Sequence, residues 1–251
     1  MRFMNVKLCQ AAVPVGMGLA LVLSAGSVWA QSSSSRMVSS CFLLPSHEVI
    51  VGTPLDGVLE SVNADRGELV KAGQVIAKLN TGLETAQLQT QEAKAEFGDR
   101  KARRNEDLYK KRVISDHELD EVKTEANLSK LELEERKQLL KLRTITSPIN
   151  GVIVDRYRAR GDLVKQEKIF KIASIDPLHA ELVVNSKLFG EFKQGQTREV
   201  FLPMLNKKVT GKVTNLDRVI DPASGTFRVR LTVPNPGSQI PSGLQCEASF
   251  N

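Results

Sequence analysis

Side chains that could do chemistry are few in this chain and lie far apart. The three histidines, His47, His117 and His179, are widely separated and fall in different predicted domains. Metalloproteases and serine hydrolases place their key residues in short motifs such as H-E-x-x-H or G-x-S-x-G, and the sequence contains neither. It also has no glycine-rich phosphate loop. We therefore predict a non-enzyme with no catalytic residues, no metal site and no cofactor.

The first thirty residues predict export. Arg2 and Lys7 precede a long uncharged stretch that ends in V-W-A at residues 28–30, which offers the small residues that signal peptidase requires. We expect cleavage there, which leaves residues 31–251 outside the cytoplasm. An uncleaved anchor is the alternative, because residues 11–30 are about long enough to span a bilayer.

Export changes the meaning of the charge and of the cysteines. Removing Arg2 and Lys7 lowers the formal net charge from +6 to +4. Outside the cytoplasm, a basic chain meets membrane surfaces or acidic proteins rather than nucleic acid. Cys41 and Cys246 remain, and such a pair forms a disulfide in an oxidising compartment. Two small buried side chains with free thiols are the alternative.

Two segments of the chain repeat each other at an offset of 94 residues. Residues 53–80 read TPLDGVLESVNADRGELVKAGQVIAKLN, and residues 147–173 read SPINGVIVDRYRARGDLVKQEKIFKIA. Each copy predicts short strands broken by turns, too few to bury their own apolar face. We therefore expect the two copies to pack together as one small β-sandwich. The glycines predicted to shape its turns are Gly57, Gly67, Gly151 and Gly161.

The segment between the copies, residues 82–142, predicts a helical hairpin. It has no proline and is rich in strong helix formers. A capping box, S-x-x-E at residues 115–118, marks the start of a second helix. Heptad spacing predicts an antiparallel coiled coil. The predicted contact rows are Leu83, Thr90 and Phe97 with Ala86 and Ala93 in the first helix, and Leu119, Ala126, Leu133 and Leu140 with Val122 and Ser129 in the second.

The repeat is similar to the biotinyl and lipoyl carrier fold. Its pattern is P-x-x-G-V followed by G-x-x-V-x-x-G-Q, which returns as S-P-x-x-G-V-I and G-D-x-V. In carriers the two halves meet at a tight turn that bears a modified lysine. Here the hairpin occupies that place, and Lys71 and Lys78 lie inside the repeat. We therefore expect no carrier function.

A lipoyl-like sandwich split by a helical hairpin resembles the periplasmic adaptor subunits, or membrane fusion proteins, of the HlyD and RND type. These subunits serve tripartite efflux and type I secretion systems. The resemblance implies a mainly β fold with a long α-helical hairpin and a β-barrel domain. The expected parts are a signal peptide (1–30), an N-terminal segment or strand (31–46), a lipoyl-like domain (47–81 plus 143–174), the hairpin (82–142) and the barrel (175–251).

The same resemblance assigns a docking site to the hairpin tip. The family motif R-x3-L-x6-S matches Arg104, Leu108 and Ser115. In the family these residues contact the outer-membrane channel. Several basic residues crowd this end, which indicates either a solvated helix end or attraction to an acidic channel rim. They are Arg100, Lys101, Arg103, Arg104, Lys110, Lys111 and Arg112, against Glu106 and Asp107.

The resemblance implies a periplasmic, envelope-associated adaptor between an inner-membrane transporter of RND or ABC type and a TolC-type outer-membrane channel. Several copies, six in the family, would form a ring for the export of small molecules. We expect a shortened form without the family's C-terminal membrane-proximal domain. The alternatives are a structural envelope coiled-coil protein and a partner subunit of a mixed adaptor ring for a type I or ABC exporter.

Overall fold

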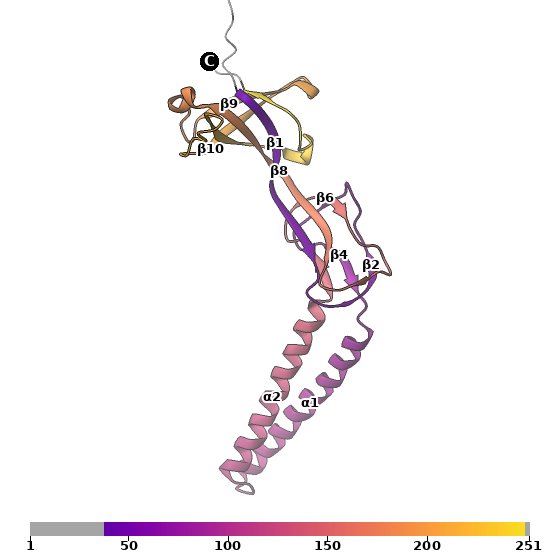
Figure 1. The fold of residues 1–251 in the computed structure, drawn as a ribbon. Helices are drawn as coiled ribbons and strands as arrows, with labels where there is room; N and C mark the ends of the chain where they lie inside the picture. The colour runs from indigo at the N-terminus through magenta and orange to yellow at the C-terminus, as the bar shows by residue number, and fades with distance from the viewer. Residues whose placement is uncertain (1–37, 249–251) are drawn as a thin grey trace, which may run out of the picture. The chain divides into compact units, whose positions relative to one another are not determined.

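The computed structural model describes residues 38–248 of the chain. These residues are mainly β, with one pair of long helices, α1 (Gly82–Lys110) and α2 (Asp116–Lys141) (Figure 1). The predicted signal segment 1–30 lies outside the described residues, as do residues 31–37. Neither of the two described helices is long and apolar enough to cross a membrane.

The two copies of the repeat form a sandwich in which they exchange strands. The first copy forms β2 (Gly57–Val62), β3 (Leu69–Val70) and β4 (Val75–Leu79), and the second forms β6 (Gly151–Arg156), β7 (Leu163–Val164) and the start of β8 (Lys168–Asn185). Before them lie β1 (Val38–Gly52) and β5 (Thr144–Thr146). One sheet has the order β5-β4-β2-β7, and the other contains β1, β8, β6 and β3. Each sheet therefore combines strands of both copies.

Matched main-chain hydrogen bonds tie the two copies together. The Gly67 amide donates to the carbonyl of Ile153 at 2.9 Å, and the equivalent Gly161 amide donates to the carbonyl of Leu59 at 2.8 Å. Both glycines have a left-handed φ, 87° and 91°, which strains other residues. Each turn thus closes onto a strand of the other copy, so neither copy is a complete folding unit.

Gly57 and Gly151 are the first residues of β2 and β6, where close packing rather than a turn explains a glycine. A side chain at Gly151 would collide with the backbone carbonyl oxygen of Ala173 in β8. At Gly57 it would lie 2.7 Å from a guanidinium nitrogen of Arg143. The bulk of a β-carbon at Gly151 therefore has no room without moving a strand.

Two separate hydrophobic cores fill the β part of the molecule. One lies inside the sandwich and includes Leu59, Ile76 and Phe170. The other lies inside the second β domain and includes Leu43 and Phe227. The strands β1 and β8 pair with each other from Val38–Val184 to Gly52–Lys168 and contribute to both cores. The predicted fold class, mainly β with a long helical hairpin, is confirmed.

The second β domain closes on itself as a barrel. Its strands follow the order β1-β8-β11-β10-β9-β12. The segment before β12 returns to β1, where Gly243 donates to the carbonyl of Leu43 and Cys246 donates to that of Cys41. Closure leaves few free sheet edges. The remaining elements are β9 (Thr197–Leu202), β10 (Lys207–Leu216), β11 (Thr226–Val233), β12 (Glu247–Ala248) and the short 3-10 helices η1 (Ser186–Glu191), η2 (Pro203–Leu205) and η3 (Pro236–Ser238).

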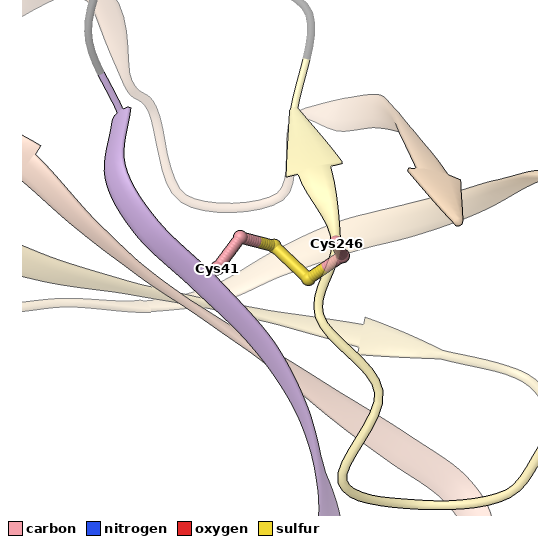
Figure 2. Close-up of a disulfide and its surroundings, with 2 residues drawn as sticks. All are labelled: Cys41 and Cys246. Atoms are coloured by element: carbon pink, nitrogen blue, oxygen red, sulfur yellow. A yellow bond between two sulfur atoms is a disulfide. The ribbon is translucent and has the colours of Figure 1, made fainter. Parts of the chain in front are cut away.

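A disulfide joins Cys41 of β1 to Cys246 at this closure (Figure 2). The two α-carbons are 4.9 Å apart, and the residues are separated by 205 positions in the sequence. Both side chains are buried. The bond therefore fastens the two ends of the described chain at the seam where the barrel closes.

The two helices pack through a narrow seam of small side chains. The buried residues are Ala95 and Gly98 on α1, and Leu119, Ala126 and Ser129 on α2. A β-carbon at Gly98 would lie 3.3 Å from the α-carbon of Ala126, so the backbones approach closely there. Lys94–Glu132 and Lys101–Glu125 form ion pairs across the seam, both at 2.7 Å.

The predicted contact rows are right for α2 and wrong for α1. On α2, Leu119, Ala126 and Ser129 are buried, and Val122, Leu133 and Leu140 are half-buried. On α1 the predicted rows face solvent, and Leu83 and Phe97 are 66% and 55% exposed. The reason is that close approach at Gly98 brings small residues to the seam of α1. Leu83 and Phe97 lie outside it, whereas Leu88 is half-buried.

Candidate docking tip of the helical hairpin

Helix α1 ends at the hairpin tip in a Schellman motif. The Arg112 amide donates to the carbonyl of Tyr109 at 2.8 Å, and the Val113 amide donates to that of Leu108 at 3.0 Å. These are the two bonds that define the motif, and they satisfy carbonyls that the helix end would leave without partners. Arg112 adopts the left-handed conformation (φ 60°) that usually selects glycine. The chain reverses here without a glycine.

The start of α2 completes the turn with a reciprocal cap. The Glu118 amide donates to the Ser115 hydroxyl at 3.3 Å, and the Ser115 amide donates to the Glu118 carboxylate at 2.8 Å. These two bonds form the capping box predicted from the sequence. The hydrogen bonds from the Ser115 amide and hydroxyl hold the pKa of Glu118 below its usual value. The carboxylate therefore stays charged at the helix N-terminus, where negative charge is favoured.

Tyr109 connects the two helices across the tip. Its side chain hydrogen-bonds to Asp116, and this bond to a carboxylate raises the pKa of the Tyr109 hydroxyl. The ring remains 39% exposed. The tip is therefore fastened on both sides of the turn, by the Schellman bonds and by this side-chain contact.

The structure places the three residues of the predicted docking motif at this tip, where they differ in exposure and in the hydrogen bonds they already make. Leu108 is 38% exposed, and Arg104 lies one turn before it on α1. Ser115 already uses its hydroxyl twice, because it accepts from the Glu118 amide and donates to the Glu118 carboxylate at 2.9 Å. A docking partner could thus offer Ser115 a donor more readily than an acceptor.

Two further large side chains of the turn, Tyr109 and Val113, are exposed beside Leu108 in the sequence or through a main-chain bond. Val113 is 65% exposed and follows the left-handed residue Arg112. In Schellman motifs this position commonly contacts the residue that Leu108 occupies here. The motif search missed both residues, because it considered only arginine, leucine and serine at fixed spacing. We define the apolar tip as Leu108, Tyr109 and Val113.

Most of the basic residues near the tip are neutralised within the hairpin. Pairs form between Arg100 and Glu96, Lys101 and Glu125, Arg103 and Asp99, and Lys110 and Asp107. Among the ion pairs of the described residues, none involves Arg104, Lys111 or Arg112. Three cations therefore surround the apolar tip without an acidic partner in the hairpin.

Arg143 fixes the other end of the hairpin to the sandwich. Its guanidinium pairs with Glu84 in the first turn of α1 and donates to the carbonyl of Asp56 at 3.0 Å. Both partner side chains of the ion pair are less than a fifth exposed. One residue thus links the end of α2, the start of α1 and the loop before β2. This role could not be predicted from the sequence, because it depends on three segments that are distant along the chain.

The histidines form no second site among the described residues. His47 and His179 lie close enough for the charge of one to affect the other. Burial, together with Arg230 and His47, lowers the pKa of His179. Across residues 38–248, no group of three histidine, cysteine or acidic side chains could hold a metal ion.

Comparison with known proteins identifies the family. The family model for a CzcB-like barrel-sandwich hybrid domain matches residues 47–174. The chain belongs to this family. The matched region is the sandwich with its inserted hairpin, so the resemblance to membrane fusion proteins is confirmed.

Curated relatives are similar over most of this chain. The cobalt-zinc-cadmium resistance protein CzcB of Cupriavidus metallidurans is 22% identical over 206 residues, which cover 76% of this chain and 40% of the relative. The solvent efflux pump periplasmic linker SrpA of Pseudomonas putida is 21% identical and covers 76% of this chain and 54% of the relative. The chain thus spans about half the length of these relatives, or less.

Solved structures share the fold. A chimeric protein of MacA and MexA, which contains the α-hairpin domain of Pseudomonas aeruginosa MexA, superposes with a TM-score of 0.71 at 19% identity. The match covers 82% of this chain and 75% of the chimera. ZneB of Cupriavidus metallidurans has a TM-score of 0.51 at 21% identity, over 84% of this chain and 68% of ZneB.

Proposed function

We propose that this protein is a periplasmic adaptor that links an inner-membrane transporter to a TolC-type outer-membrane channel for the export of small molecules. The observation that carries the proposal is the hairpin tip. Three exposed side chains, Leu108, Tyr109 and Val113, lie near three cations of the tip that form no ion pair within the described part of the chain. The names of the relatives, an efflux system protein and a periplasmic linker, support the same function.

The tip suits a helical partner that offers an apolar groove with acidic edges. Leu108 would enter the groove, because the removal of its apolar surface from water lowers the free energy of the complex. Arg104, one turn away on the same helix, would donate to a carboxylate at the groove edge. Ser115 would accept a hydrogen bond through its remaining lone pair. These are the roles that the family motif assigns to the three residues.

The rest of the molecule would position the tip. Cross-helix ion pairs hold the two helices together. The Arg143 anchor holds the hairpin to the sandwich. Copies of the protein, six as in the family, would surround a duct, and the barrel would contact a transporter of RND or ABC type. The signal segment would be cleaved and the protein would remain in the periplasm. We assign it no catalytic activity.

Affinity capture from the native cell envelope tests this function. Tagged wild-type protein is expected to recover an outer-membrane channel and an inner-membrane transporter, identified by mass spectrometry. Leu108→Asp places a charge in the groove and is expected to lower channel recovery at least tenfold, with the transporter retained. Met204→Asp is the matched control, because Met204 is 80% exposed but lies in η2 of the barrel domain.

The results separate the proposed function from its alternatives. Recovery of neither partner by the wild type would favour a structural envelope protein. Recovery of the transporter with a second adaptor, but no channel, would favour a subunit of a mixed ring for a type I or ABC exporter. Equal channel recovery by wild type and Leu108→Asp would remove the tip as the docking site.

A further inference from the structure

A cavity of about 150 Å³ lies at the base of the hairpin, at the end opposite to the docking tip. Three segments enclose it: the first turns of α1, the last turns of α2 with the residues after them, and the loop before β2. Its volume is several times what one water molecule needs. The residues that line it are Leu55, Glu84, Gln87, Arg136, Leu139 and Arg143.

Arg143 lines this cavity with one hydrogen-bond donor unused. Its guanidinium donates to the Glu84 carboxylate and, through Nη1, to the carbonyl of Asp56 at 3.0 Å. Gly57 leaves the space that this group occupies, since a β-carbon there would lie 2.7 Å from Nη1. The remaining nitrogen, Nε, is buried and has no hydrogen-bond partner in the described part of the chain. A buried N–H without an acceptor is unfavourable, so a ligand that supplies an acceptor is favoured here.

Arg136 brings a second cation to the same cavity. Its side chain is exposed, and among the ion pairs of residues 38–248 none involves it. Glu132, one turn before it on α2, already accepts hydrogen bonds from Lys94 and Gln91, both at 2.7 Å. Arg136 is therefore available to a ligand.

The charge of the lining favours an anion. Two arginines and one glutamate line the cavity, which gives the lining a net charge of +1. The glutamate, Glu84, is already paired with Arg143. A cation would meet two positive groups and only one carboxylate, whereas an anion would meet one positive group that has no partner.

The donor groups of the lining suit oxygen atoms in particular. A guanidinium presents several N–H groups in one plane, which matches the oxygens of a carboxylate or a phosphate. The exposed Gln87 adds a side-chain amide that can donate as well. Leu55 and Leu139 form apolar parts of the wall, and such surroundings strengthen charged hydrogen bonds.

We propose that this cavity binds a small oxyanion, either inorganic phosphate or the carboxylate group of a small molecule, which contacts Arg136 and the Nε of Arg143. The anion supplies the acceptor that Nε lacks and neutralises the excess charge of the lining. Because the lining comes from α1, α2 and the loop before β2, the bound anion ties these three segments together. The site thus strengthens the attachment of the hairpin to the sandwich, and it does not depend on the adaptor role.

Isothermal titration calorimetry of the full exported protein tests the site. One titration uses inorganic phosphate and a second uses acetate, both in chloride buffer at constant ionic strength. Arg136→Gln removes the exposed cation and leaves the Arg143 anchor in place. Lys137→Gln is the matched control, because it removes the same charge from the next residue of α2, which is turned by about 100° and does not line the cavity.

We expect the wild type to bind at least one of the two anions saturably, with one site per chain. Arg136→Gln should bind it about tenfold more weakly, because a charged hydrogen bond is lost, and Lys137→Gln should bind it as the wild type does. The anion that binds more tightly identifies the acidic group of the ligand. Failure of the wild type to bind either anion would overturn the proposal. Equal affinities of Arg136→Gln and Lys137→Gln would overturn it as well.

Hydrogen exchange and a second variant test the buried donor and its effect on the hairpin. The bound anion should slow exchange in the first turns of α1 and the last turns of α2 in the wild type, but not in Arg136→Gln. An unchanged exchange pattern at saturating anion would overturn the effect on the hairpin. Arg143→Lys keeps the positive charge but lacks Nε, so it should also lose anion binding while circular dichroism shows that its helices persist. Wild-type affinity in this variant would overturn the role of Nε, and the Arg136→Gln comparison decides the proposal if the variant unfolds.

Discussion

The sandwich and the hairpin of this protein are stabilised in opposite ways. The sandwich encloses a large apolar core in which residues such as Leu59, Phe170 and Ile172 are fully buried. The hairpin buries only small side chains together with Leu119, and relies on ion pairs between its helices. The sandwich is therefore stabilised by its own buried core. The hairpin instead keeps several of its large apolar side chains exposed, where other molecules can contact them.

The largest loss of stability is expected when a large side chain is removed from the sandwich core. Phe170→Ala leaves a cavity in a fully buried position and should lower the free energy of unfolding by about 3–5 kcal/mol. Val58→Ala removes a side chain that is 44% exposed and should change it by less than about 0.5 kcal/mol. Denaturant titration of both variants measures the contrast. Equal losses would show that this core does not dominate the stability of the sandwich.

Loss of the disulfide should weaken the barrel and spare the hairpin. Replacing Cys41 and Cys246 together by alanine is expected to cost about 2–5 kcal/mol, because the bond restricts the unfolded chain. Hydrogen exchange should rise along β1 and β12 and stay unchanged in α1 and α2. Reducing agent under unfolding conditions should destabilise the wild type alone. A barrel of unchanged stability in the double variant would contradict the role of the bond as a closure.

Within the hairpin, substitutions at the neighbouring residues Gly98 and Phe97 should change stability by very different amounts. Gly98→Leu forces a large side chain against the backbone of Ala126 and is expected to cost about 1–3 kcal/mol. Phe97→Ala, one residue away and exposed, should cost less than about 0.5 kcal/mol in dilute protein. Thermal unfolding followed by circular dichroism compares them. If Phe97→Ala lost more stability than Gly98→Leu, Phe97 would belong to the helix–helix seam, as the heptad spacing predicted.

Among the substitutions that remove or crowd a structural contact, the smallest loss of stability is expected at the cap of α2. Ser115→Ala removes the hydroxyl of the capping box and should cost about 1 kcal/mol, seen as faster hydrogen exchange at the Glu118 amide. Ser115→Thr keeps a hydroxyl and should restore most of the protection. If alanine and threonine behaved alike, the hydroxyl would have no capping role.

The difference between the two regions also explains what could be predicted from the sequence. The sandwich could be predicted from the repeat, because glycines such as Gly67 and Gly161 recur at one offset. Both have a left-handed backbone that favours glycine. The exchange of strands between the copies was not predictable, since either copy could pair with itself. The start of α2 was predicted, because a capping box is a local motif.

The register of α1 could not be predicted from its pattern of large residues. Two heptad rows exist on this helix, one of small seam residues such as Gly98 and one of larger residues such as Phe97. The pattern of apolar side chains predicted that the row with Phe97 contacts α2. In the structure the row with Gly98 makes this contact, because it allows the two backbones to approach closely. The tip motif located Leu108, but Tyr109 and Val113 required the turn itself, in which the Val113 amide bonds to the carbonyl of Leu108. Arg143 likewise became visible only when three separate segments came together.

The most direct test of the adaptor role is quantitative capture of the outer-membrane channel by wild type, Leu108→Asp and Met204→Asp, expressed at equal levels in the native envelope. We expect equal recovery by the wild type and Met204→Asp, and at least a tenfold loss with Leu108→Asp. Recovery of the channel by all three proteins alike, or by none of them, would contradict it.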